Sequence, residues 1–183
     1  EEKKCFPIKK LGWQRKGFWA YMDKIFIPGE GMQNLDEWGM APVGKNKFIV
    51  PAFSAAYAKQ RESNPERFED EEMLIYCQSP ITLDEYLGGM KDVFGDNGLI
   101  GAAYGIMTLF RDVVFDVNGC FPHLNGVGPK STGKSVWAKC ISQLFFDDRT
   151  FFQLNSGTDA GFYTYLSQFP NALAIMNEFD RAN

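Results

Sequence analysis

The chain has 183 residues, of which 45% are hydrophobic and 15% aromatic, and its formal net charge is −4. This hydrophobic content is enough for a buried core, so it excludes a disordered chain, and the acidic balance argues weakly against a broad nucleic-acid-binding face. The longest apolar run, residues 99–110, is too short and too glycine-rich to span a bilayer, so no membrane partner is expected. Four scattered cysteines, with no C-x-x-C pair, argue against a zinc site and predict reduced, mostly buried thiols in a cytoplasmic protein: Cys5, Cys77, Cys120 and Cys140.

Residues 1–78 are predicted to form a β-rich N-terminal region. Residues 12–13 and 17–21 flank a polar stretch, as in a hairpin, and further strands are expected at 24–27, 47–50 and 73–77, with a helix at 55–59. Four aromatic residues form either a stacking platform for bases or, as is more common, the packed face of a small sheet: Trp13, Trp19, Tyr21 and Trp38. Basic residues crowd the N-terminus and form either a solvated face or a contact to a phosphate backbone: Lys3, Lys4, Lys9, Lys10, Arg15 and Lys16.

Residues 79–117 are predicted to be a helical connector. The sequence Thr-Leu-Asp-Glu at 82–85 is a capping box that starts a helix running to Phe94. A second helix is expected over 99–113, after a glycine-containing break at 95–98. Small residues in this helix predict that another helix packs closely against it: Gly101, Ala102, Ala103 and Gly105.

Residues 118–183 are predicted to form an incomplete nucleotide-binding core around one motif. Eight consecutive residues match the pattern G-x-x-x-x-G-K-S: Gly128, Pro129, Lys130, Ser131, Thr132, Gly133, Lys134 and Ser135. The two glycines permit backbone conformations that a side chain would block, so that N–H groups and the next helix surround a phosphate. Lys134 is expected to reach the β- and γ-phosphates of ATP, and the Ser135 hydroxyl is expected to bind Mg²⁺. A chance glycine-rich turn is the alternative.

The surroundings of the motif predict an α/β fold with a parallel sheet. A buried strand is expected at 121–128 and an amphipathic helix after Lys134, followed by strands at 150–154 and 172–176 with a helix at 159–169 between them. Asn155 or Thr158 lies just outside a strand's carboxyl end and either faces the nucleotide or caps the following helix.

The third of these strands ends in Asn177 and Glu178, which resembles a Walker B strand with its acidic end. Glu178 is expected to polarise the attacking water, and both residues are candidates, with Ser135, for the Mg²⁺ site. Asn177 stands where an aspartate is usual, and an amide carbonyl accepts a hydrogen bond from metal-bound water without adding charge. A core strand that ends in a surface glutamate is the alternative.

These motifs resemble the ATPase part of primase–helicases from phages and mobile elements, in the superfamily 3-like branch of P-loop ATPases. The resemblance rests on FPHLNGVGPKSTGKS, NSGTDAGFYTYLSQF and NALAIMNEFD, with a looser match over residues 8–180. It implies a DNA-dependent ATPase of DNA replication that acts as a homo-oligomeric ring on single-stranded DNA, with the DNA contacts outside this sequence. Such a sheet has more than three parallel strands, so the chain is expected to be a fragment.

Two other functions stay open. A small-molecule or nucleotide kinase uses the same loop but needs a lid with arginines, and Arg149 and Arg181 are isolated in the sequence. A non-catalytic interaction module would bind nucleotide as a structural or switching ligand, which Asn177 favours.

Overall fold

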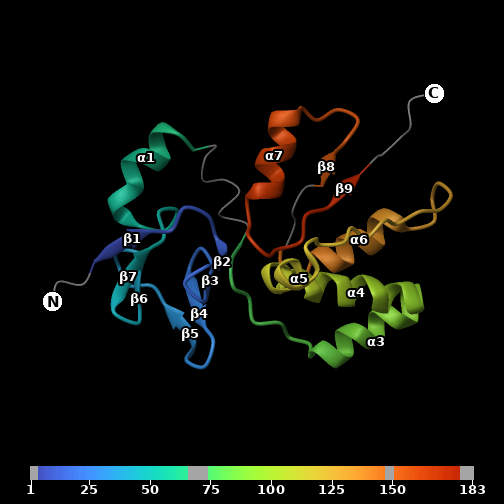
Figure 1. Ribbon diagram of the computed structural model, residues 1–183, viewed down its shortest axis with the longest axis horizontal. Coiled ribbons are helices and arrows are strands. Elements are labelled where there is room, and N and C mark those ends of the chain that lie inside the picture. Colours follow the sequence, from blue (N-terminus) through green and yellow to red (C-terminus); the bar gives the residue numbers. More distant parts are fainter. Residues whose placement is uncertain (1–3, 66–73, 147–150, 178–183) are drawn as a thin grey trace. The chain divides into compact units, whose positions relative to one another are not determined.

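The computed structural model describes residues 4–65, 74–146 and 151–177, and the chain divides into two compact units. The first unit comprises Glu1–Cys77 with Ser167–Pro170, and the second comprises Gln78–Leu166 with Asn171–Asn183. The chain is mixed α/β, as predicted (Figure 1). Most pairings among the described strands are antiparallel, however, so the predicted parallel P-loop core is not confirmed.

The first unit is built from two small sheets. One is β1–β7–β6, in which β1 is parallel and β6 antiparallel to β7, and the other is the antiparallel meander β2–β3–β4–β5. The strands are β1 (Cys5–Pro7), β2 (Gly12–Gln14), β3 (Phe18–Ala20), β4 (Lys24–Ile27), β5 (Gly31–Asn34), β6 (Met40–Val43) and β7 (Asn46–Ile49). The expected helix is present as η1 (Ala55–Tyr57) followed by α1 (Ala58–Ser63).

The predicted hairpin is confirmed as β2 and β3. Trp13 lies opposite Trp19, and the Gly17 N–H donates a 2.8 Å hydrogen bond to the Gln14 carbonyl across the turn. Gly17 has a φ of 86°, a left-handed conformation that a side chain disfavours. The next two predicted strands are also observed, as β4 and β7.

The core of the first unit lies between its two sheets. Phe18 of β3 packs against Phe48 of β7, with 4.8 Å between ring centroids. Phe18, Ile25 and Val50 are fully buried. Phe18 and Ile25 lie on one face of the meander, and Trp19, on its other face, is also buried, with 7% of its surface exposed.

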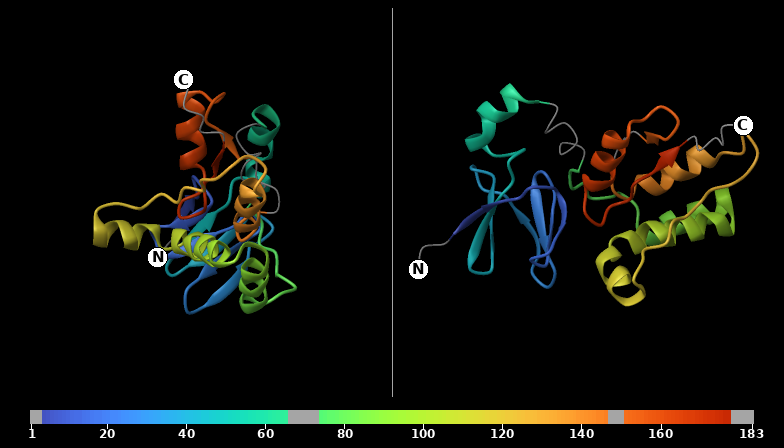
Figure 2. Two further views of the ribbon diagram at one scale, coloured as in Figure 1. Left: turned by 90° about the vertical axis from the view of Figure 1, so that its right-hand side faces the viewer. Right: turned by 45° about the horizontal axis from the view of Figure 1, so that its top comes forward.

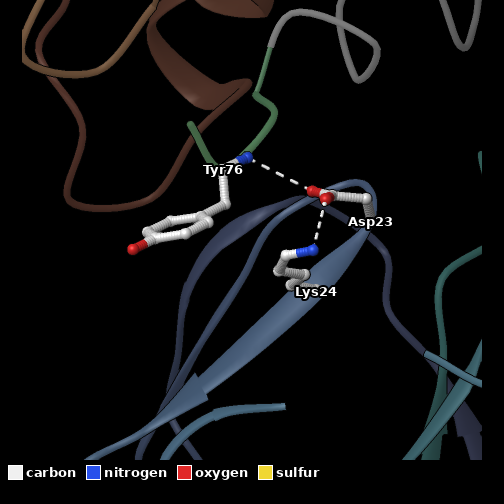
Figure 3. Close-up of polar contacts among 3 residues, drawn as sticks. All are labelled: Asp23, Lys24 and Tyr76. Atoms are coloured by element: carbon white, nitrogen blue, oxygen red, sulfur yellow. Dashed lines mark hydrogen bonds and ion pairs between the residues drawn. The ribbon is translucent and has the colours of Figure 1, made fainter. Parts of the chain in front are cut away.

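Residues 74–77 are not a strand, so the prediction for the described part of 73–77 is wrong. Asp23, in the bend between β3 and β4, holds this segment instead (Figure 3). One Asp23 carboxylate oxygen accepts a 3.2 Å hydrogen bond from the Tyr76 N–H, and the other lies 3.3 Å from Lys24 Nζ. A side chain thus takes a backbone N–H group that a sheet ladder would have used.

The second unit contains five helices in the parts described and a two-stranded parallel sheet. They are α3 (Leu83–Phe94), α4 (Asp96–Thr108), α5 (Arg111–Asn118), α6 (Lys134–Ser142), α7 (Asp159–Ser167), β8 (Phe152–Gln153) and β9 (Met176–Asn177). The capping box is confirmed, because Thr82 Oγ1 accepts from the Glu85 N–H and Glu85 Oε2 accepts from the Thr82 N–H. Within the described ranges, no single helix has the length and apolar content needed to cross a bilayer.

The prediction of one helix over 99–113 is wrong, because α4 and α5 are separate helices bent by 88°. The side chain of Asn171 lies at the break. Its amide group donates to the Leu109 carbonyl at 2.9 Å and to Asp112 Oδ1 at 2.8 Å. This distant residue takes a carbonyl that a continuous helix would have used, so a tertiary contact ends α4.

The strand predicted at 121–128 is also wrong. The segment is irregular, and Val127 is 92% exposed instead of buried. It is held by α4: the Tyr104 hydroxyl donates to the Pro122 carbonyl at 3.0 Å, and the Tyr104 ring lies 5.9 Å from that of Phe121. Proline also lacks the N–H group that a sheet ladder needs.

The cysteines differ from the prediction as well. All four are free thiols, but Cys5, Cys77 and Cys120 are exposed and only Cys140 is partly buried. The expectation of mostly buried thiols is therefore wrong.

Helices α3, α4 and α6 lie side by side and form the hydrophobic core of the second unit (Figures 1 and 2). The small residues predicted in α4 are where α6 packs. A Cβ atom on Gly101 would lie 2.5 Å from Ile141 Cδ1 and 2.7 Å from the Trp137 ring, and one on Gly105 would lie 2.8 Å from Ile141 Cγ2. The absence of side chains at these two positions therefore sets the spacing of α4 and α6.

Replacing Gly101 by alanine is expected to destabilise the second unit by about 1 kcal/mol or more, because overpacking costs more than helix propensity returns. Gly88, at an exposed position of α3, is the matched control, since a Cβ atom there would meet nothing within 4 Å. Gly88→Ala should stabilise the chain by about 0.5–1 kcal/mol. Urea unfolding measures both, and equal effects would contradict this account of the α4–α6 contact.

Stability should also fall at alkaline pH through Tyr86. Burial, with a smaller contribution from the neighbouring Cys140 thiol, raises the pKa of the Tyr86 hydroxyl to about 12, and this hydroxyl donates to the Cys140 carbonyl at 3.2 Å. Because the folded pKa exceeds the ordinary value of 10.0, the stabilisation is complete below that value and is lost as pH rises towards about 12. Urea unfolding at about pH 9 and about pH 11 should show a smaller loss for Tyr86→Phe than for the unchanged chain.

Candidate nucleotide-binding site

The predicted phosphate-binding residues form one loop that leads directly into α6. Lys134 is the first residue of this helix, and its ammonium group folds back over the loop. Lys134 Nζ donates to the Gly128 carbonyl at 2.8 Å and to the Pro129 carbonyl at 2.6 Å. Thr132 Oγ1 donates to the same Pro129 carbonyl at 2.9 Å. The two ends of the motif are therefore brought together by the lysine that is expected to bind phosphate.

The backbone of the loop has a left-handed conformation at two alternate positions. Ser131 has a φ of 64°, and Gly133, at the N-cap of α6, has a φ of 83°. Such changes of hand turn successive N–H groups towards one side, where they can surround an anion. The N–H groups of the first turn of α6 also lack intrahelical partners, and the helix dipole makes that end positive.

The two glycines of the motif do not have the same role. The prediction that both adopt conformations closed to other residues holds for Gly133 but is wrong for Gly128, which does not have a positive φ. A Cβ atom on Gly128 would lie 3.5 Å from Thr132 Oγ1, an ordinary contact. In this structure only Gly133 is required by backbone conformation.

Trp137, in the first turn of α6, fixes the helix that carries the loop. Its indole N–H donates to the Asn97 carbonyl at the start of α4, at 3.0 Å. Its ring lies against Gly101 on one side, and a Cβ atom on Gly126 would lie 3.1 Å from the ring on another. One side chain thus contacts α4 and the segment that enters the loop, so the position of Lys134 depends on it.

The strands β8 and β9 are parallel and joined through α7, so their carboxyl ends lie at one edge of the small sheet (Figure 1). Asn177 pairs with Gln153, and its carbonyl accepts a 3.0 Å hydrogen bond from the Leu154 N–H. Thr158 caps α7, because its hydroxyl accepts from the Gly161 N–H at 3.1 Å. The capping interpretation of Thr158 is therefore the one observed, and Glu178 lies outside the described residues.

The structure joins the loop residues to one another but does not join Asn177 to them by a hydrogen bond in the residues described. Within residues 4–65, 74–146 and 151–177, no group of three or more His, Cys, Asp or Glu side chains could hold a metal. The predicted Mg²⁺ site uses Ser135, Asn177 and Glu178, of which Glu178 lies outside the described residues, and it remains a prediction.

A cavity of about 410 Å³ runs along α6 from the end of the loop, and sequence analysis missed it. It is lined by Ser135, Val136, Lys139, Cys140, Gln143 and Phe151. Three of its polar residues, Ser135, Lys139 and Gln143, recur at intervals of four and so share one face of the helix. That spacing was visible in the sequence, although most of the cavity lining is apolar.

The chain matches no protein-family profile, no curated protein and no solved structure. Its function must therefore be argued from the loop and the elements that position it.

The two glycines of the loop should respond differently to alanine. Gly133→Ala is expected to lower the free energy of unfolding by about 1–2 kcal/mol, because a left-handed conformation is strained for residues with a side chain. Gly128→Ala should change it by less than about 0.5 kcal/mol. Urea unfolding of both variants tests this, and an equal loss in both would mean that Gly128 is also conformationally constrained.

Proposed function

We propose that this chain carries the nucleotide-binding part of a P-loop ATPase, the motor of a DNA helicase or primase–helicase in phage or mobile-element replication. The observation that carries the proposal is the arrangement of Lys134. The ammonium group lies over the Gly128 and Pro129 carbonyls, next to the left-handed Gly133 and the N-terminus of α6. A lysine, a left-handed turn and a helix N-terminus at one place suit a polyphosphate anion.

In this proposal each residue has a separate role. The N–H groups of the loop and of α6 hold the phosphates, and Lys134 exchanges its two carbonyl partners for phosphate oxygens. Ser135 binds Mg²⁺, which when bound neutralises charge between the β- and γ-phosphates. Asn177 accepts a hydrogen bond from metal-bound water, and Glu178 polarises the attacking water.

The β8–α7–β9 arrangement supports the proposal because its two strands are parallel, so that their carboxyl ends lie at the same edge of the sheet. Ligands of open α/β sheets bind outside the carboxyl ends of parallel strands, and Asn177 lies at such an end. The helicase part of the proposal comes from the sequence resemblance, which implies a homo-oligomeric ring acting on single-stranded DNA. Nothing in the loop itself selects DNA, so the nucleotide is the part to test first.

Titration calorimetry with Mg²⁺-ATP is the test. The unchanged chain should bind, and Lys134→Ala should weaken binding at least about tenfold, equivalent to about 1.4 kcal/mol. Lys91→Ala is the control, because Lys91 is an exposed lysine near the end of α3 and should leave binding unchanged. Equal affinity of all three proteins, or no binding by a folded chain, would contradict the proposal.

Phosphate release from ATP then separates the motor from a non-catalytic nucleotide-binding module. A motor should release phosphate faster when single-stranded DNA is added. Binding without release under both conditions would favour the module, and transfer of phosphate to an added acceptor would favour a kinase.

A further inference from the structure

The four-stranded sheet of the first unit carries a row of large apolar side chains across all of its strands. Trp13 of β2 pairs with Trp19 of β3, Trp19 pairs with Phe26 of β4, and Phe26 pairs with Met32 of β5. Directly paired residues of adjacent antiparallel strands point to the same face of a sheet. These four residues therefore form one continuous row, which we call the aromatic row.

The aromatic row lies on the outer face of the sheet. Side chains alternate between faces along a strand, and the neighbours Phe18 and Ile25 are fully buried in the core. The row is accessible at Trp13, Phe26 and Met32, because Phe26 is 40% exposed and the other two are half-buried, whereas Trp19 at its centre is 7% exposed and belongs to the core. Trp13 and Phe26 are therefore the aromatic rings of the row that a ligand can reach.

Two tyrosines extend the aromatic surface beside the row. The Tyr21 ring lies 6.1 Å from that of Trp19, and the Tyr76 ring meets Tyr21 edge-on at 5.6 Å. The contacts of Asp23 with the Tyr76 N–H and with Lys24 hold this end of the surface in place (Figure 3). The rings are therefore positioned before any ligand binds.

The basic side chains of the four-stranded sheet outnumber its acidic ones, although the whole chain is acidic. Residues 12–34 include three basic side chains, Arg15, Lys16 and Lys24, and two acidic ones, Asp23 and Glu30, of which Asp23 contacts Lys24. The β2–β3 turn carries exposed Arg15 and Lys16, two and three positions after Trp13. Lys24 alternates with Phe26 along β4 and so lies on the same face.

We propose that the aromatic row and the β2–β3 turn bind single-stranded nucleic acid. Bases stack on Trp13 and Phe26, and Arg15 and Lys16 contact the phosphates of the same strand. The ligand is single-stranded because the bases of a duplex are already stacked and cannot offer their faces to a flat aromatic surface. This inference depends on strand register and charge and differs from the expectation that the DNA contacts lie outside this sequence, and its test does not require the proposed ATPase activity.

The test is fluorescence polarisation of a labelled oligo(dT) of about 12 nucleotides, measured without ATP or Mg²⁺. The unchanged chain should bind, and Phe26→Ala should weaken binding about fivefold or more, because one stacking surface is lost. Trp38→Ala is the matched control, since Trp38 is 52% exposed but lies outside the aromatic row. It should leave the affinity unchanged.

A second pair of variants tests the phosphate contact. Lys16→Ala should weaken binding and reduce the slope of log affinity against log salt by about 0.7, as expected for one lost contact to a single strand. Lys45→Ala, in the exposed β6–β7 turn, should change neither quantity. Circular dichroism confirms that each variant is folded.

Three results would overturn the inference: no oligo(dT) binding by the folded chain, an equal effect of Phe26→Ala and Trp38→Ala, or tighter binding of a DNA duplex than of the single strand. The ATP titration addresses a different unit, so the two proposals can fail separately.

Discussion

The close contact between α4 and α6 is the constraint on which the candidate site depends. Gly101 and Gly105 leave room for Trp137 and Ile141, and no larger residue fits there without displacing a ring or a buried side chain. Trp137 then bonds to Asn97 and lies against the segment that enters the loop. Lys134 precedes Trp137 by less than one helical turn. The packing of Trp137 therefore determines where the Lys134 ammonium group lies.

Features controlled by neighbouring residues could be predicted from the sequence. The hairpin around Gly17, the capping box of Thr82 and Glu85, and the start of α6 at Lys134 all follow from local chemistry. Each depends on a turn conformation, a cap or a helix N-terminus formed within a few residues. The glycines of α4 were also informative, because small residues at helical spacing have few roles other than close packing.

Features decided by distant residues could not be predicted in this way. Asn171 ends α4 by bonding to the Leu109 carbonyl, and Tyr104 holds the segment at Pro122 that was expected to be a strand. In both cases one side chain from elsewhere in the chain takes a backbone group that regular structure would have used. Hydrophobic periodicity indicates which residues prefer to be buried, but it does not indicate which backbone carbonyl accepts a hydrogen bond from a distant side chain.

Under the proposed function, the positive charge at the loop would hold the phosphates even though Asn177 is neutral. In the proposed function, Lys134 exchanges its two hydrogen bonds to neutral carbonyls for bonds to phosphate oxygens, whose negative charge adds an ionic attraction. The positive end of α6 contributes in the same direction. If the chain binds a nucleotide as proposed, the phosphates are held by the loop, and an amide at position 177 is expected to affect the binding of Mg²⁺. The proposal therefore assigns nucleotide affinity and metal dependence to different parts of the site.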